Sequence, residues 1–201
     1  KLNTIETGMT GIKSPAGVKS TTAVSTVYET ITTEKHLEKW LKIVNESEFT
    51  SIDTETTSLN PMRAMVIGIS LATSANKAAY IPVGHTQDNT SDQLDKSFVL
   101  EKLKKWLEDP SQLKIGQNIK YDMHVFANQG IQLRGVSHDT LLASYVLESH
   151  KSHKLDNLAD EKLNIKTTSY HELVGTGKNQ LKFEDVLISK ATEYAAEDAD
   201  V

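Results

Sequence analysis

The chain has 201 residues, of which 38% are hydrophobic and 24% charged, a length and balance typical of one sizeable soluble globular domain. It contains no cysteine, which excludes disulfides and thiolate-bound zinc and leaves only carboxylate or histidine side chains as metal ligands. The net charge of −5 argues against a protein that coats nucleic acid nonspecifically, but it does not exclude an enzyme that holds phosphate through metal ions.

No apolar run is long enough to cross a bilayer, and the first residues are too polar for a signal peptide. We therefore expect a cytoplasmic protein without membrane contact. Residues 1–27 are rich in Gly, Ser and Thr without any sustained period, which is typical of a linker or flexible arm. Residues 28–201 are then expected to form a single domain.

An amphipathic helix capped by Thr33 is predicted from apolar residues at helical spacing. These residues are Leu37, Trp40, Leu41 and Val44. Three strands follow, one beginning at Phe49 and the others at residues 64–72 and 78–83. Because short turns join them, they are expected to form an antiparallel meander.

The second half alternates helices with short strands. Helices are predicted at residues 97–108, from Asp122 to about Gly130, and at 140–149, and a short strand at 113–116. The segment Ser137-His138-Asp139 is expected to cap the 140–149 helix, whose inward residues would be Leu141, Leu142, Tyr145 and Val146. A further helix contains Leu155 to Leu163, and a last one runs from about Phe183 to the end. This order predicts an α/β fold with a mixed sheet, three antiparallel strands followed by parallel ones, flanked by helices.

Two acids lie at the end of the first meander strand. Asp53 and Glu55 are two residues apart, so both side chains project from the same face of the strand. Two carboxylates about 4 Å apart repel by roughly 4 kcal/mol at an effective dielectric constant near 20. A proton on one acid, a basic partner or a divalent cation would relieve this repulsion. The nearest basic residue, Arg63, lies beyond the following turn, so we favour a cation with oxygen ligands.

Two further motifs complete a pattern. Asn118 and Asp122 stand at a helix start, and Tyr194 and Asp198 are four apart on one helix face. With Asp53-x-Glu55, these spacings resemble the three exonuclease motifs of the DEDD superfamily in its tyrosine variety. Three longer segments are similar to the proofreading domain of bacterial DNA polymerase I, a family with a ribonuclease H-like fold. They are Gly116-Gln-Asn-Ile-Lys-Tyr-Asp122, Gly177-Lys-Asn-Gln-Leu181 and Tyr194-Ala-Ala-Glu-Asp-Ala-Asp-Val201.

The resemblance implies a 3′-5′ exonuclease that hydrolyses the terminal phosphodiester of single-stranded DNA and releases nucleoside 5′-monophosphates. Two divalent ions, Mg²⁺ or Mn²⁺, would be held by Asp53, Glu55, Asp122 and Asp198, with Asp53 touching both. Tyr194 and Glu55 would orient the attacking water. The family's partners would be a single-stranded DNA 3′ end and a polymerase domain in the same parent chain, and the protein is expected to be a monomer.

The same resemblance suggests substrate contacts. Leu59 matches a leucine that wedges against the terminal base, and Tyr170 falls where a base can stack, a contact worth about 1–3 kcal/mol. Gln117, Asn118 and Lys120 would reach phosphates or sugars. The oxygen ligands are complete without histidine. Six histidines are therefore expected to be surface or capping residues: His85, His124, His138, His150, His153 and His171.

Two departures from the family pattern stand out. Ser152 stands where the family has an arginine, so a phosphate contact is either missing or supplied by Lys151 or Lys154. The sequence also stops three residues after Asp198, where the family's last helix continues, so we expect an excised domain whose truncated final turn frays.

Two other functions remain open. An RNase D-like exoribonuclease shares the acids and the tyrosine, but the polymerase-like text around Lys178 and Glu197 argues against it. A non-catalytic module that only binds DNA ends is the third possibility. Comparison of DNA with RNA, and of binding with cleavage, would separate them.

Overall fold

The computed structural model describes residues 26–86 and 93–201, and most of the predicted arm (residues 1–27) lies outside them. Six strands form one mixed sheet in the order β1-β4-β3-β2-β5-β6. The strands are β1 (Val27–Thr30), β2 (Phe49–Thr56), β3 (Val66–Ser74), β4 (Lys77–Pro82), β5 (Leu113–Gly116) and β6 (Val136–Asp139). Strands β2, β3 and β4 form the predicted antiparallel meander, whereas β5 and β6 continue the sheet in parallel. The expected mixed sheet is confirmed.

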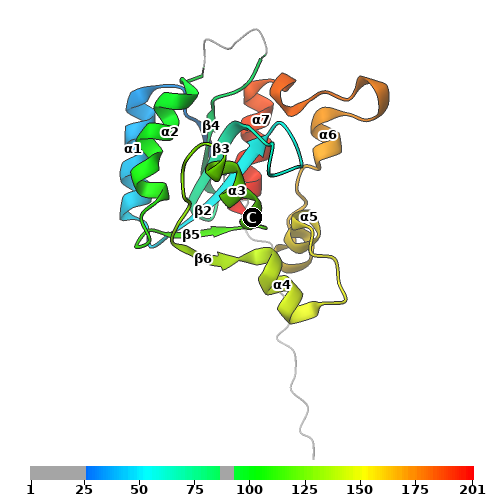
Figure 1. The fold of residues 1–201 in the computed structure, drawn as a ribbon. Helices are drawn as coiled ribbons and strands as arrows, with labels where there is room; N and C mark the ends of the chain where they lie inside the picture. Colours follow the sequence, from blue (N-terminus) through cyan, green and yellow to red (C-terminus); the bar gives the residue numbers. More distant parts are fainter. Residues whose placement is uncertain (1–25, 87–92) are drawn as a thin grey trace, which may run out of the picture.

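Helices cover both faces of this sheet (Figure 1). They are α1 (Glu34–Glu46), α2 (Lys96–Leu107), α3 (Lys120–Ala127), α4 (Thr140–Glu148), α5 (Leu155–Leu158), which continues into a π-helical turn (Ala159–Leu163), α6 (Tyr170–Val174) and α7 (Ile188–Asp200). Local sequence explains several boundaries. Thr33 and Asp139 accept hydrogen bonds from the first-turn amides of α1 and α4, as predicted, and Ser169 with Glu172 forms a capping box on α6.

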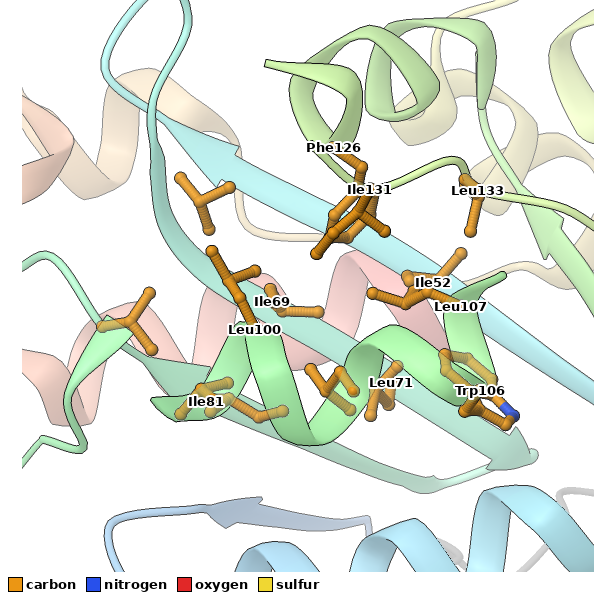
Figure 2. Close-up of a cluster of buried hydrophobic side chains, with 14 of the residues drawn as sticks. Ile52, Ile69, Leu71, Ile81, Leu100, Trp106, Leu107, Phe126, Ile131 and Leu133 are labelled. Carbon is orange, nitrogen blue, oxygen red and sulfur yellow. The ribbon is translucent and has the colours of Figure 1, made fainter. Parts of the chain in front are cut away.

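One face of the sheet packs against α1, α2 and α3 and holds the main core (Figure 2). Ile52 and Leu71 project from the strands toward Trp106 and Phe126 of the helices, and all four side chains are at most 2% exposed. Each such large apolar side chain contributes about 1.5–3 kcal/mol by leaving water.

The opposite face carries α7, and small residues bring helix and sheet close together. Ala72 and Ala78 of the sheet pack with Ala196 and Ala199 of the helix in one buried cluster. Because alanine side chains are small, they allow a close approach of the two backbones. This packing sets the height of α7 above the strand that carries the predicted acid pair.

Three expectations need correction. Val27 belongs to β1, which pairs with β4, so strand structure already begins at the last residue of the predicted arm. Residues 136–139 form strand β6, although the sequence was expected there only to cap the following helix. In α4 no residue is buried, and Leu142, Tyr145 and Val146 are 51–87% exposed instead of facing inward. The reason is that α4 follows β6, the last strand of the sheet, and lies beyond its edge (Figure 1).

Side chains hold the last turn of α7, which the sequence analysis expected to fray. Asp200 accepts hydrogen bonds from the Tyr28 hydroxyl at 2.9 Å and from the backbone N–H of Asn76 at 2.7 Å. Two residues before it, Asp198 therefore sits in a turn tied to β1 and to the β3–β4 turn. Among the described residues, no helix combines the length and apolar character needed to cross a bilayer.

Candidate active site

A cavity of about 830 Å³ opens where β2, α3, α6 and α7 meet. It collects all five predicted catalytic side chains: Asp53, Glu55, Asp122, Tyr194 and Asp198. They come from three elements separated by up to 145 positions in sequence, and the fold brings them to one concave surface. The other lining residues include Leu59, Gln117, Asn118, Tyr170 and Phe183.

Strand β2 supplies the acid pair because its side chains alternate. Ile52 and Thr54 point into the core on one face, while Asp53 and Glu55 point to the opposite face, toward α7. The residue across from Glu55 on β3 is Gly68, which presents no side chain. A β-bulge between Glu55 and Thr56 then ends the regular pairing beside the cavity.

Asp122 lies in the first turn of α3, where the helix dipole favours a negative charge. It is 2% exposed, and the Thr54 hydroxyl donates a 2.5 Å hydrogen bond to its Oδ1. Thr54 therefore ties α3 to the strand that carries the acid pair. The sequence analysis gave Thr54 no role, since a strand threonine carries no signal of its partner.

Burial raises the pKa of all four predicted metal-binding carboxylates, and the charge of Asp53 raises it further for the other three. Burial raises the pKa of Asp53 to about 6, and burial followed by the charge of Asp53 raises that of Asp198 to about 8. Burial again comes first for Glu55 and Asp122, whose pKa values are raised further by Asp53 and, for Glu55, by the other two acids. Burial, then Asp198 and Glu55, raise the pKa of Tyr194, so its phenol stays protonated.

This donor set fits a hard divalent cation. The four carboxylates offer only oxygen ligands, as Mg²⁺ and Mn²⁺ prefer, and a cation would reverse the repulsion that raises their pKa values. Within residues 26–86 and 93–201, no three acidic or histidine side chains are already close enough to enclose an ion.

Leu59 and Tyr170 flank the cavity and are open to solvent. Leu59 is 95% exposed, and Tyr170 is 41% exposed with its ring centroid 6.3 Å from that of Tyr194. The Tyr121 hydroxyl bonds to the Ser58 carbonyl at 2.5 Å and so fixes the turn that presents Leu59. Tyr121 also lines the cavity, although the sequence analysis assigned it no function.

The three residues expected to reach phosphates or sugars differ in their position relative to the cavity. Asn118 lines the cavity from a left-handed backbone conformation, φ 58°, which asparagine tolerates well. The amide of Gln117 is already engaged, since it donates to the His153 carbonyl at 2.8 Å and its oxygen accepts from Thr140. Lys120 is exposed and does not belong to the cavity lining.

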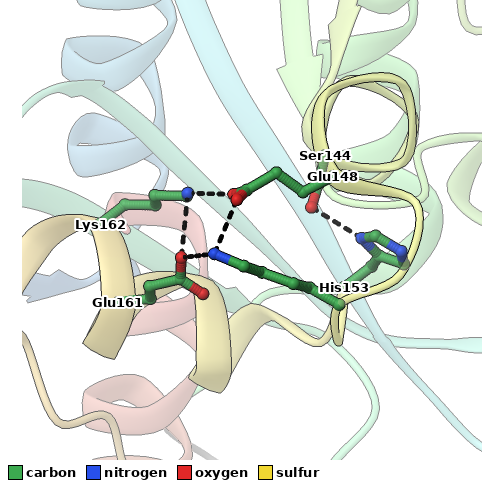
Figure 3. A network of polar contacts seen from close by, with 6 residues as sticks. Ser144, Glu148, His153, Glu161 and Lys162 are labelled. Atoms are coloured by element: carbon green, nitrogen blue, oxygen red, sulfur yellow. Dashed lines mark hydrogen bonds and ion pairs between the residues drawn. The ribbon is translucent and has the colours of Figure 1, made fainter.

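Two of the six histidines contradict the expected surface role. His85 is 3% exposed and His153 is 7% exposed. The Ser144 hydroxyl and His153 Nδ1 are 2.7 Å apart (Figure 3), and the centroid of the tilted Tyr145 ring lies 3.7 Å from that of the imidazole. Sequence position shows none of this, because the partners of His153 are set by how the chain turns back on α4.

Ion pairs hold this turn against the π-helical segment. Lys151 and Lys162 each pair with both Glu148 and Glu161, at 2.5–3.1 Å (Figure 3). The predicted phosphate contact by Lys151 is therefore in competition with two carboxylates.

The mixed six-stranded sheet with helices on both faces is a ribonuclease H-like α/β fold. Residues 28–201 match the family described as 3′-5′ exonuclease, and the chain belongs to this family. The particular relatives are named DNA polymerase I: that of Pseudomonas aeruginosa is 44% identical over 177 residues, which cover 87% of this chain and 19% of the relative. The chain thus spans about a fifth of the length of such relatives.

Solved structures agree on the fold. Brucella melitensis NrnC is 24% identical with a TM-score of 0.57, covering 77% of this chain and 68% of that one. Escherichia coli RNase D, an exoribonuclease, is 19% identical with a TM-score of 0.59, covering 87% of this chain and 42% of that one.

Proposed function

We propose that the chain is a metal-dependent 3′-5′ exonuclease that removes nucleoside 5′-monophosphates from the 3′ end of single-stranded DNA. The observation that carries this proposal is the gathering of four carboxylates and the Tyr194 phenol in one cavity. Family membership supports the reaction, and the names of the relatives favour DNA over RNA.

The carboxylates would hold two divalent ions, Mg²⁺ or Mn²⁺. Asp53, whose charge raises the pKa of the other three acids, would hold these ions together with Glu55, Asp122 and Asp198. When bound, such a pair supplies an activated water and stabilises the departing 3′ oxygen. Thr54 would keep Asp122 oriented for this role through its hydrogen bond.

The protein's own groups would orient the reactants. Tyr194 stays protonated, so its hydroxyl can donate a hydrogen bond while Glu55 accepts one, and together they would hold a water in line with the phosphorus. Leu59 would wedge against the terminal base, and Tyr170 offers a ring for stacking. Asn118 would contact the sugar or phosphate, whereas Gln117 would have to release its present partners and Lys120 would act from outside the cavity.

In a longer parent protein, this domain would serve as the proofreading part of a DNA polymerase I and receive the single-stranded 3′ end from a polymerase domain. The chain's coverage of only 19% of the P. aeruginosa relative is consistent with such a parent. We propose that the domain acts as a monomer.

The test follows nucleotide release from 5′-labelled single-stranded DNA and RNA of the same sequence in Mg²⁺, Mn²⁺ or EDTA. The proposal expects a ladder that shortens from the 3′ end of DNA, disappears in EDTA and in Asp53→Asn, and persists in the control Asp160→Asn, an exposed aspartate. Faster loss of RNA would support the exoribonuclease alternative. Tight binding of DNA without cleavage would leave only an end-binding module.

A further inference from the structure

His85 is a buried titratable group outside the cavity lining, and its hydrogen bonds fix its tautomer. Nδ1 lies 3.0 Å from the Val186 carbonyl, which can only accept, so Nδ1 carries the proton. Burial lowers the pKa of His85, so the ring is neutral and Nε2 is an acceptor. The Tyr80 hydroxyl, 2.8 Å from Nε2, is therefore the donor of the second bond.

Tyr80 lies directly beside the acid pair. Its ring fills the space above Gly68, where an added Cβ would meet the phenol oxygen at 2.1 Å, and Gly68 is the cross-strand neighbour of Glu55. Burial raises the pKa of Tyr80, and the charges of Glu55 and Asp53 add to this effect, so both carboxylates are within electrostatic reach. The fully buried phenol forms a wall behind Glu55.

On its other side, His85 contacts residues 183–186, a segment that packs against Tyr194. The next residue, Thr86, bonds to the Glu184 carbonyl at 2.8 Å and to Asp185 at 2.6 Å. The Phe183 ring at the start of this segment lies 5.8 Å from the His85 ring and 6.2 Å from the Tyr194 ring.

We propose that Tyr80 and His85 act together as positioning residues, which join the wall behind Glu55 to residues 183–186 and so keep the Tyr194 phenol and the Glu55 carboxylate aligned on the same water. The inference rests on the proposed exonuclease function. Neither residue lines the cavity, so neither touches the DNA. Their loss should therefore change turnover far more than substrate binding.

Two variants remove the same hydrogen bond from opposite ends. Tyr80→Phe deletes the donor, while His85→Asn deletes the Nε2 acceptor but leaves an amide that can still reach the Val186 carbonyl. His138→Asn, at an exposed histidine, is the matched control. The single variants, the double variant and each of these combined with Tyr194→Phe are assayed on single-stranded DNA with Mg²⁺. Each assay is run at a temperature well below the Tm of the protein.

We expect about a tenfold fall in kcat for each variant with less than a twofold change in KM. The double variant should match either single one, and the effect should shrink to less than twofold when Tyr194 is already Phe. Unchanged kcat in the folded variants, or an undiminished effect in the Tyr194→Phe background, would overturn the positioning role. A wild-type chain without Mg²⁺-dependent cleavage would instead overturn the exonuclease function, and the positioning role with it.

Discussion

Removal of the Asp200 carboxylate should loosen the end of α7. In Asp200→Ala, the Tyr28 hydroxyl and the Asn76 amide both lose their acceptor. Each hydrogen bond to a charged group contributes about 1.5–3 kcal/mol, but both bonds are only partly buried, so water replaces part of each when the carboxylate is removed. We therefore expect a loss of about 2 kcal/mol, equivalent to a fall in Tm of about 4–8 °C for a domain of this size.

Amide hydrogen exchange measures this loss of stability at individual residues. If the last turn opens by itself, 2 kcal/mol corresponds to about 30-fold faster exchange of the amides of residues 196–198, while the amides of β3 should keep their protection. Tyr28→Phe, which removes one bond, should give an intermediate rate, and Asp160→Ala should give the wild-type rate. Rapid exchange in the wild-type chain, or equal rates in wild type and Asp200→Ala, would refute the reasoning and restore the expectation of a frayed terminus.

Further predictions concern the acids, the outer core and α4. In EDTA at pH 8, Asp53→Asn should raise Tm, because the substitution removes one buried negative charge from a cluster of acids that repel one another. Mg²⁺ should raise the Tm of the wild type but not that of the variant. A lower Tm for the variant in EDTA would contradict this prediction. Burial alone would raise the pKa of Glu29, but hydrogen bonds from His36, Trp40 and Lys39 hold it at about 2. This ionised form is stabilising above the unfolded-state pKa near 4.5 and loses its effect as the pH falls toward 2, so Glu29→Gln should cost about 1–3 kcal/mol in urea unfolding at pH 7 and progressively less below pH 4.5. A gap independent of pH would rule out the charge as its source. Val146→Ser, at an 87% exposed position, should leave Tm within about 1 °C by calorimetry, and a large fall would mean that α4 packs inward after all.

Sequence alone determined the local features. Period and capping located α1, α2 and the β2–β4 meander, because these signals are carried by residues within a few positions of one another. The alternation of β2 put Asp53 and Glu55 on one face, and the spacing of the three motifs indicated the family and all five side chains that share the cavity.

Only the tertiary structure decided what depends on distant partners. The burial of His85 and His153 requires Tyr80, Val186 and Ser144 to be brought against them, and no local pattern encodes those contacts. The apolar residues of α4 have a helical period, but a period shows only which face is apolar and not whether another element covers it. The anchoring of α7 was likewise invisible, since Asp200 and Tyr28 are 172 positions apart and meet only because the helix packs across β1.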